Sequence, residues 1–197
     1  MGKEKSTIRH RIRQIQQQKR EKFNPVADEH ELSKAIRRVA DEIYRDYRGE
    51  KATLICVDHG GKPFFNLLYD NLSNRKDITL YFGHVKTTSR VDGKQIDIKV
   101  GYEAIPPLHD MHVIIVDDIL DSGYTLDFLQ KRYSKAKSVE TAVLIEKKLK
   151  HQYEINPKYI GLKLFERKGV WITGFGMDFK NKYRKIRRLF EVPKGHK

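Results

Sequence analysis

Apolar residues recur along the chain in two patterns, one with the period of a helix and one in short continuous runs. In the first quarter of the chain, apolar positions three or four residues apart predict one amphipathic helix: Leu32, Ile36, Val39, Ile43 and Tyr47. Asp28 and Glu31, just ahead of this stripe, have the spacing of a capping box, so the helix should begin near residue 28. Gly49 should end it.

Five short runs rich in β-branched and other apolar residues predict strands: 52–57, 78–85, 112–116, 140–145 and 159–165. Helical patterns at 63–72 and 124–135 alternate with them. This alternation indicates an α/β fold, in which a parallel sheet is covered by helices on both faces and joined by right-handed crossovers. The loops after Val57, Val85 and Val116 should then meet at the carboxyl ends of the strands, where ligands bind in such sheets.

Positive charge is concentrated at the two ends of the chain. The 197 residues carry a formal net charge of +14, of which residues 1–24 contribute +6 and residues 180–197 contribute +7. The centre is therefore nearly neutral. Nucleic acid remains an alternative partner for the ends, but a less favoured one, since terminal charge is often solvated and no aromatic-interleaved RNA-binding motif accompanies it.

The chain divides into three predicted parts. A basic N-terminal helix or extension covers residues 1–24, the main domain covers 25–190, and a basic tail covers 191–197. The N-terminal helix rests on three apolar residues at helical spacing: Ile8, Ile12 and Ile15. The Asn24–Pro25 step should end it.

The single cysteine, Cys56, excludes an internal disulfide, and no group of His and Cys residues has the spacing of a zinc motif. Cys56 lies within an apolar run, which favours a buried structural thiol over a nucleophile. No apolar run approaches the roughly 20 residues of a membrane-spanning helix, and the first residues lack the apolar stretch of a secretory signal. We expect a cytoplasmic protein with no membrane partner.

The segment VIIVDDILDSGYTL, residues 113–126, has an unusual chemistry. Asp117 and Asp118 follow four β-branched residues, and carboxylates at a strand end can accept hydrogen bonds from vicinal sugar hydroxyls or bind a metal ion. Asp121-Ser122-Gly123-Tyr124-Thr125 then leads into a helix, whose N-terminus and loop amides can hold an anion. Strand capping and an ordinary turn are the alternative, but paired carboxylates beside a buried strand are costly without cations or sugar donors.

This segment resembles the signature of the hypoxanthine-guanine branch of the purine phosphoribosyltransferases, and the similarity extends from about residue 26 to 190. The resemblance implies a type I phosphoribosyltransferase fold, a Rossmann-like sheet with flanking helices and a small hood. N- and C-terminal segments would form this hood, with contributions from the first helix of the 25–190 domain and from residues 160–190. It implies that Asp117 and Asp118 engage the ribose hydroxyls and Mg²⁺, and that Asp121 is the general base or acid near N7 of the purine. The residues that would hold the 5-phosphate are Ser122, Gly123, Tyr124 and Thr125.

Downstream residues match the purine-binding half of the same family. By resemblance, Lys147 donates to the 6-oxo group, Trp171 stacks on the base, and the backbone of Ile172 reads the base edge. Asp178 matches an acid that assists a second Mg²⁺, and Arg184 matches a residue that meets pyrophosphate. Taken singly, each could be a core or surface residue; the complete spacing favours the purine-binding interpretation.

Two loops depart from the family pattern. The predicted pyrophosphate loop reads Asp58-His59-Gly60-Gly61, where the family usually has an apolar residue followed by lysine, arginine or another residue in a strained peptide. Its glycines permit close backbone approach to an anion, whereas Asp58 would repel pyrophosphate unless it points away or binds metal. The predicted catalytic lid, between residues 85 and 100, has lost the family's serine-tyrosine pair and contains Lys86, Thr87, Thr88 and Ser89.

These features predict an enzyme that transfers the phosphoribosyl group from phosphoribosyl pyrophosphate (PRPP) to N9 of hypoxanthine or guanine, in purine salvage. The resemblance also implies a homo-dimer or tetramer. One alternative is a xanthine-preferring variant. Another is a non-enzymatic regulator with the same fold, which binds a nucleotide and uses its basic ends to hold nucleic acid.

Overall fold

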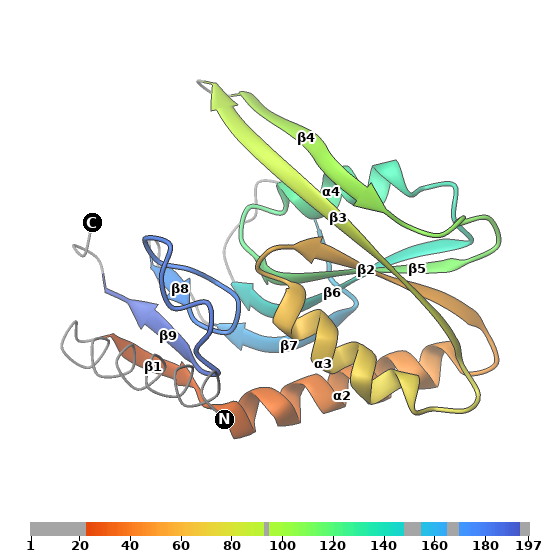
Figure 1. The fold of residues 1–197 in the computed structure, drawn as a ribbon, viewed down its shortest axis with the longest axis horizontal. Helices are drawn as coiled ribbons and strands as arrows, with labels where there is room; N and C mark the ends of the chain where they lie inside the picture. The colour runs from red at the N-terminus through yellow and green to blue at the C-terminus, as the bar shows by residue number, and fades with distance from the viewer. Residues whose placement is uncertain (1–22, 93–94, 148–154, 165–169, 194–197) are drawn as a thin grey trace, which may run out of the picture. The chain divides into compact units, whose positions relative to one another are not determined.

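A computed structural model describes residues 23–92, 95–147, 155–164 and 170–193 (Figure 1). The chain forms two compact units: Ser33–Glu166, and a terminal unit that combines Met1–Leu32 with Arg167–Lys197. Most of the predicted N-terminal helix and the end of the basic tail lie outside the described residues.

The larger unit contains a six-stranded sheet in the order β4-β3-β2-β5-β6-β7. All neighbouring strands are parallel except β4, which runs antiparallel to β3. The strands are β2 (Lys51–Asp58), β3 (Thr79–Asp92), β4 (Gln95–Ala104), β5 (His112–Leu120), β6 (Ser138–Lys147) and β7 (Tyr159–Leu164). The predicted α/β class is confirmed, with β4 as an antiparallel addition at one edge.

Within the described residues, three helices accompany this sheet: α2 (Glu29–Tyr47), α3 (Lys62–Ser73) and α4 (Tyr124–Arg132). The chain moves from β2 through α3 to β3 in one direction along the sheet, and from β5 through α4 to β6 in the other. Right-handed crossovers in opposite directions place their helices on opposite faces, as Figure 1 shows for α3 and α4. None of the described helices is long and apolar enough to cross a membrane.

The predicted capping box at the start of α2 is present. The Asp28 amide donates to Glu31 Oε2 at 2.8 Å, and the Glu31 amide donates to Asp28 Oδ1 at 2.9 Å. Each side chain thus satisfies a backbone donor that the first turn of the helix leaves without a partner. The accepted hydrogen bond from the Glu31 amide also lowers the pKa of Asp28.

Hydrophobic packing is concentrated in the central strands, because helices cover both faces of the sheet there. The buried runs are Leu54 to Val57 in β2, Val113 to Val116 in β5 and Ala142 to Ile145 in β6. Cys56 lies within the first of them and is fully buried, as expected. The buried core therefore ends immediately before the segments that carry the polar residues.

Helix α2 is fastened to β7, at the sheet edge, by polar contacts. Arg38 donates to the backbone oxygens of Ile160 and Gly161 at 2.8 and 2.7 Å. Tyr159 is 1% exposed, and its hydroxyl donates to Asp46 Oδ2 at 2.7 Å. A buried hydroxyl that donates to a carboxylate makes one of the stronger hydrogen bonds in a protein.

Removing that hydroxyl should destabilise the protein without changing its fold. We expect Tyr159→Phe to lower the free energy of unfolding by about 1–2 kcal/mol, because a charge-assisted hydrogen bond is lost. Denaturant unfolding followed by circular dichroism measures the change. Tyr102→Phe, at a side chain that is 57% exposed, is the control and should change stability by less than about 0.5 kcal/mol. Equal effects of both variants would contradict the role of Tyr159.

The terminal unit contains a three-stranded antiparallel sheet in the order β1-β9-β8. Its strands are β1 (Asn24–Ala27), β8 (Trp171–Thr173) and β9 (Leu189–Val192). A small core holds it together, in which Phe23 meets Tyr183 and Phe179 edge to face. Segments from both ends of the chain thus build one sheet, to which the N-terminal side contributes strand β1. Residues 160–164 of the predicted hood lie instead in β7 of the larger unit, and the hood stays a prediction. β9 runs across the boundary predicted after residue 190, and the domain boundaries stay a prediction.

Candidate active site

The acidic pair of the central motif lies at the carboxyl end of β5. Asp117 is only 9% exposed, and its Oδ1 accepts a hydrogen bond from the Asp118 amide at 2.9 Å. Burial, and then the neighbouring Asp118 carboxylate, raise the pKa of Asp117 well above its usual value. The site therefore favours a bound cation, which would stabilise both carboxylates in their charged forms.

The loop after β5 closes around the N-terminus of α4. Gly123 adopts φ 82°, a left-handed conformation that side chains disfavour, and its oxygen accepts the Asp127 amide at 3.0 Å. Ser122 Oγ accepts from the Tyr124 amide at 3.4 Å. Hydroxyls and the backbone amides at the start of α4 are thus gathered where the predicted 5-phosphate would bind.

A cavity of about 280 Å³ lies against this loop. The acidic pair and the loop form most of its wall, and Val57, Asp58, Gly60 and Thr87 add to it from β2, the following loop and β3. The remaining lining residues are Asp117 to Leu126. The predicted ribose, phosphate and general-base residues therefore share one cavity with parts of the predicted pyrophosphate loop and lid.

The pyrophosphate loop packs tightly against the acidic pair. A Cβ at Gly60 would lie 1.7 Å from Asp118 Oδ2, and one at Gly61 would lie 2.8 Å from the Val57 oxygen. Gly61 therefore meets fixed backbone and requires glycine, whereas a side chain at position 60 would displace the Asp118 carboxylate. The Asp58–His59 peptide bond is cis. His59 itself is exposed and is not among the residues that line the cavity.

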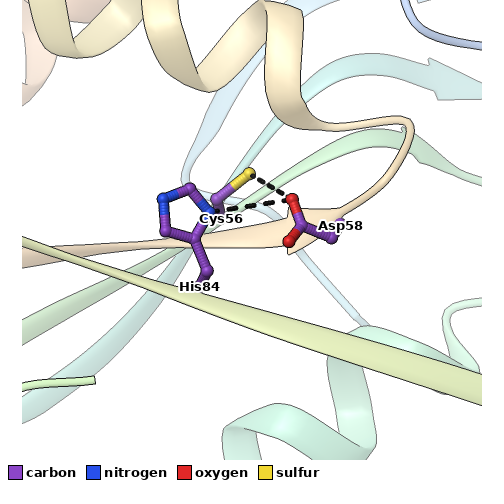
Figure 2. A group of neighbouring side chains, drawn as sticks. All are labelled: Cys56, Asp58 and His84. Carbon is purple, nitrogen blue, oxygen red and sulfur yellow. Dashed lines mark hydrogen bonds and ion pairs between the residues drawn. The ribbon is translucent and has the colours of Figure 1, made fainter. Parts of the chain in front are cut away.

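Asp58, the residue that departs from the family pattern, points toward Cys56 and His84 (Figure 2). Its Oδ1 is 3.8 Å from Cys56 Sγ and 3.7 Å from His84 Nδ1. The sequence alone did not predict this group. The alternation of Cys56 and Asp58 placed them on one face of β2, but only the register of β3 brings His84 beside them.

The predicted lid is a strand hairpin rather than an irregular loop. β3 continues past Val85 to Asp92 and pairs with β4, with a register shift between Lys86 and Thr87. Thr87 reaches the cavity lining, and Thr88 Oγ1 is 3.5 Å from the Lys99 oxygen. The side chain of Ser89 lies outside the described part of the chain.

Lys147, at the end of β6, meets the predicted general base. Its Nζ lies 3.1 Å from Asp121 Oδ2, and the lysine side chain is 17% exposed. The residue expected to donate to the 6-oxo group and the residue expected near N7 are thus direct neighbours. Both belong to the larger unit.

The other predicted purine-binding residues belong to the terminal unit and are gathered there. Trp171 is 55% exposed, and its Nε1 donates to the Asp178 oxygen at 2.5 Å. Arg184 forms an ion pair with Asp178 and donates to the Gly176 oxygen at 2.8 Å. Ile172 is buried and pairs through its backbone with Glu191. One exposed aromatic ring is therefore held beside an acid and an arginine.

Comparisons with known proteins match these features. A 28% identical relative over 162 residues is the bifunctional protein TilS/HprT of Listeria monocytogenes, in which the match covers 80% of this chain but 24% of the relative. The chain thus spans about a quarter of that relative's length. The hypoxanthine-guanine phosphoribosyltransferase of Bacillus subtilis is 25% identical over 160 residues, covering 80% of this chain and 86% of the relative.

A solved structure of a hypoxanthine-guanine phosphoribosyltransferase from Bacillus anthracis superimposes with a TM-score of 0.73 at 26% identity, covering 86% of this chain and 98% of that one. The family described as the phosphoribosyl transferase domain matches residues 24–180. The predicted resemblance to the hypoxanthine-guanine branch is confirmed, and this chain belongs to the phosphoribosyltransferase domain family.

Proposed function

We propose that this protein transfers the phosphoribosyl group of PRPP to N9 of a 6-oxopurine, hypoxanthine or guanine, and releases pyrophosphate. The products would be IMP or GMP. The observation that carries the proposal is the Lys147–Asp121 pair at 3.1 Å. Asp121 lines the same cavity as the acidic pair and the phosphate loop, so a donor and a proton acceptor for the base lie beside the groups that suit a ribose 5-phosphate.

The sugar half of the site binds through charge and backbone geometry. Asp117 and Asp118 accept hydrogen bonds from the ribose hydroxyls. Ser122, Thr125 and the amides of the loop hold the 5-phosphate at the N-terminus of α4, where the helix dipole favours an anion. Gly123 and Tyr124 complete this cradle, since the left-handed glycine turns the chain into the helix.

Magnesium is the cofactor that this donor set favours. Carboxylate oxygens are the ligands that Mg²⁺ prefers, and the raised pKa of Asp117, which burial and Asp118 cause, indicates a site that gains from a cation. When bound, Mg²⁺ supplies positive charge to the pyrophosphate and the ribose hydroxyls. Asp117 and Asp118 would hold one ion, and Asp178 would assist a second.

The base half of the site orients the purine and manages its proton. Lys147 donates to the 6-oxo group, and Asp121 accepts or returns the proton at N7. Trp171 stacks on the ring, and the backbone of Ile172 reads its edge. Because the ribose carbon gains positive charge as pyrophosphate leaves, positioning and charge neutralisation supply most of the rate enhancement.

The leaving pyrophosphate has its own predicted contacts. Gly60 and Gly61 offer backbone amides at close range, Arg184 supplies a positive charge, and His59 is a further predicted contact. Lys86, Thr87 and Thr88 on β3 would cover the reacting groups from water.

A panel of bases tests the proposal. With PRPP and Mg²⁺, the purified protein should convert hypoxanthine and guanine to nucleotides and should not convert adenine. The same panel measures the rate with xanthine. Ultraviolet difference spectra report nucleotide formation. Turnover of xanthine alone would support the xanthine-preferring variant, and turnover of no base would contradict the enzyme.

Lys147 should decide between 6-oxo and 6-amino purines. We expect Lys147→Met to lower kcat/KM for hypoxanthine by about 10–100-fold, because one charge-assisted hydrogen bond to the base is lost. The preference over adenine should shrink by a similar factor. Lys163→Met is the control, since Lys163 pairs with Glu146 on the neighbouring strand. Unchanged base preference in Lys147→Met would remove this residue from the purine site.

The protein's assembly and location complete the proposal. We propose that the protein forms a homo-dimer or tetramer and that it is located in the cytoplasm. Light scattering on the purified protein measures its oligomeric state directly. The comparisons favour the enzyme and offer no support to the nucleic-acid-binding regulator.

A further inference from the structure

Cys56, Asp58 and His84 form a compact group of three different metal-ligand types on the larger unit (Figure 2). Cys56 and Asp58 are two residues apart on β2, so they point to the same face of the sheet. His84 is the register partner of Cys56 on the parallel neighbour β3. One ligand atom from each of the three lies within 4.8 Å of the others.

Two of the three separations are close to those around a tetrahedral zinc ion, and the third, between Cys56 and His84, is within 4.8 Å. Zinc bonds of about 2.3 Å to sulfur and about 2.0–2.2 Å to nitrogen and oxygen place neighbouring ligands about 3.4–3.6 Å apart. The observed distances are 3.8 Å from Cys56 Sγ to Asp58 Oδ1 and 3.7 Å from His84 Nδ1 to the same oxygen. Small side-chain rotations would bring all three atoms to bonding distance of one ion.

His84 carries the second observation. Its Nδ1 is buried and makes no hydrogen bond, although it faces the Asp58 carboxylate at 3.7 Å. Buried polar atoms normally have a partner, and one without a partner calls for an explanation such as a bound ion. The ring is positioned by Phe65 of α3, at a centroid distance of 5.3 Å, which leaves Nδ1 directed at the space between the three side chains.

We propose that Cys56, Asp58 and His84 bind a thiophilic divalent cation of the zinc type. A thiolate and an imidazole select zinc over magnesium, so this site is chemically distinct from the acidic pair on β5. Three protein ligands leave the fourth position open for water or a ligand oxygen.

The proposed metal site is open to solvent on one side and lies beside the cavity. Cys56 is fully buried, but the side chains of Asp58 and His84 are 17% and 26% exposed, so an ion can enter from their side. Asp58 also lines the cavity. A bound cation would therefore neutralise the acidic residue that replaces the family's usual residue beside the pyrophosphate loop.

Cobalt(II), which occupies zinc sites and reports its ligands by absorption, tests the proposal on full-length, chelator-treated protein. We expect one equivalent to bind with a thiolate-to-cobalt charge-transfer band in the near ultraviolet. Zinc should displace it, and magnesium should not. Cys56→Ser should abolish the band, and His84→Phe should weaken cobalt binding by at least about 100-fold, because loss of supporting partners alone costs 10–100-fold.

Matched variants separate this site from incidental binding by other histidines. His109→Gln removes an exposed histidine that pairs with Asp110 and should leave the titration unchanged. If Cys56→Ser fails to fold, the cobalt titration of His84→Phe tests the site instead. The His84 side chain is partly exposed, so we expect the variant to fold, which circular dichroism checks. The absence of the band in the wild type, or equal binding by wild type and His84→Phe, would overturn the proposal. The result is independent of phosphoribosyl transfer, which the base panel tests separately.

Discussion

Asp121→Asn should lower kcat for nucleotide formation by about 100-fold or more while leaving the fold intact. General acid–base catalysis contributes about 10²–10⁴ in rate, and an amide cannot accept and return the N7 proton as a carboxylate does. Asp121 is 58% exposed as a side chain, so the isosteric change should cost little stability. Steady-state kinetics with saturating hypoxanthine and PRPP measure the loss, and thermal unfolding checks the fold.

Two controls define what that result means. Asp41→Asn removes an exposed carboxylate that pairs with Arg75 on the surface of the larger unit, and it should leave kcat unchanged. The KM for PRPP should change little in Asp121→Asn, because Asp117, Asp118 and the phosphate loop remain. An unchanged kcat would show that Asp121 has no role in proton transfer.

Gly60→Ala should lower kcat/KM for PRPP by about 100-fold or more. Its Cβ would lie 1.7 Å from Asp118 Oδ2, so either the loop or the carboxylate must move. Displacements of about 1 Å at a reacting centre cost on the order of 10²-fold. Here the movement affects a predicted pyrophosphate contact and a predicted ribose contact together.

Gly101→Ala provides the matched control for this substitution. A Cβ at Gly101 would meet only the Lys86 oxygen, at 3.8 Å, an ordinary contact distance. Its activity should stay within about threefold of the wild type, since surface substitutions without a clash have small effects. Equal activity of Gly60→Ala and the wild type, measured as initial rates over a range of PRPP concentrations, would contradict the tight packing of this loop.

The elements that sequence predicts best are those whose signals are local. The stripe on α2 and its capping box lie within 20 residues of chain, and the structure places both as expected. The motif that runs from β5 into α4 is equally local, because strand, acidic pair, left-handed glycine and helix follow one another directly. Local hydrogen bonding and side-chain periodicity determine such features.

Features that depend on strand register could not be predicted in the same way. The Lys147–Asp121 contact joins residues 26 positions apart, and the resemblance indicated each residue without their contact. The group of Cys56, Asp58 and His84 requires the pairing of β2 with β3. Register is a property of the assembled sheet, since a shift by one residue moves every side chain to the other face.

The sequence did not predict the three short strands of the terminal unit or the extension of β3, for a different reason. β1, β8 and β9 have three or four residues each, too few for an alternating pattern to stand out from chance. The extension of β3 to Asp92 was hidden by its polar residues, because polar strands at a sheet edge resemble loops in sequence. Pairing with β4 defines that segment.

Product stoichiometry tests the central claim most directly. Wild-type protein incubated with PRPP, Mg²⁺ and hypoxanthine should form IMP and pyrophosphate in equal amounts, which anion-exchange chromatography resolves and quantifies. Omission of hypoxanthine should stop pyrophosphate release almost completely, because the base is the attacking group. Pyrophosphate release without IMP, or no consumption of PRPP with any 6-oxopurine, would contradict a phosphoribosyl transfer to purines.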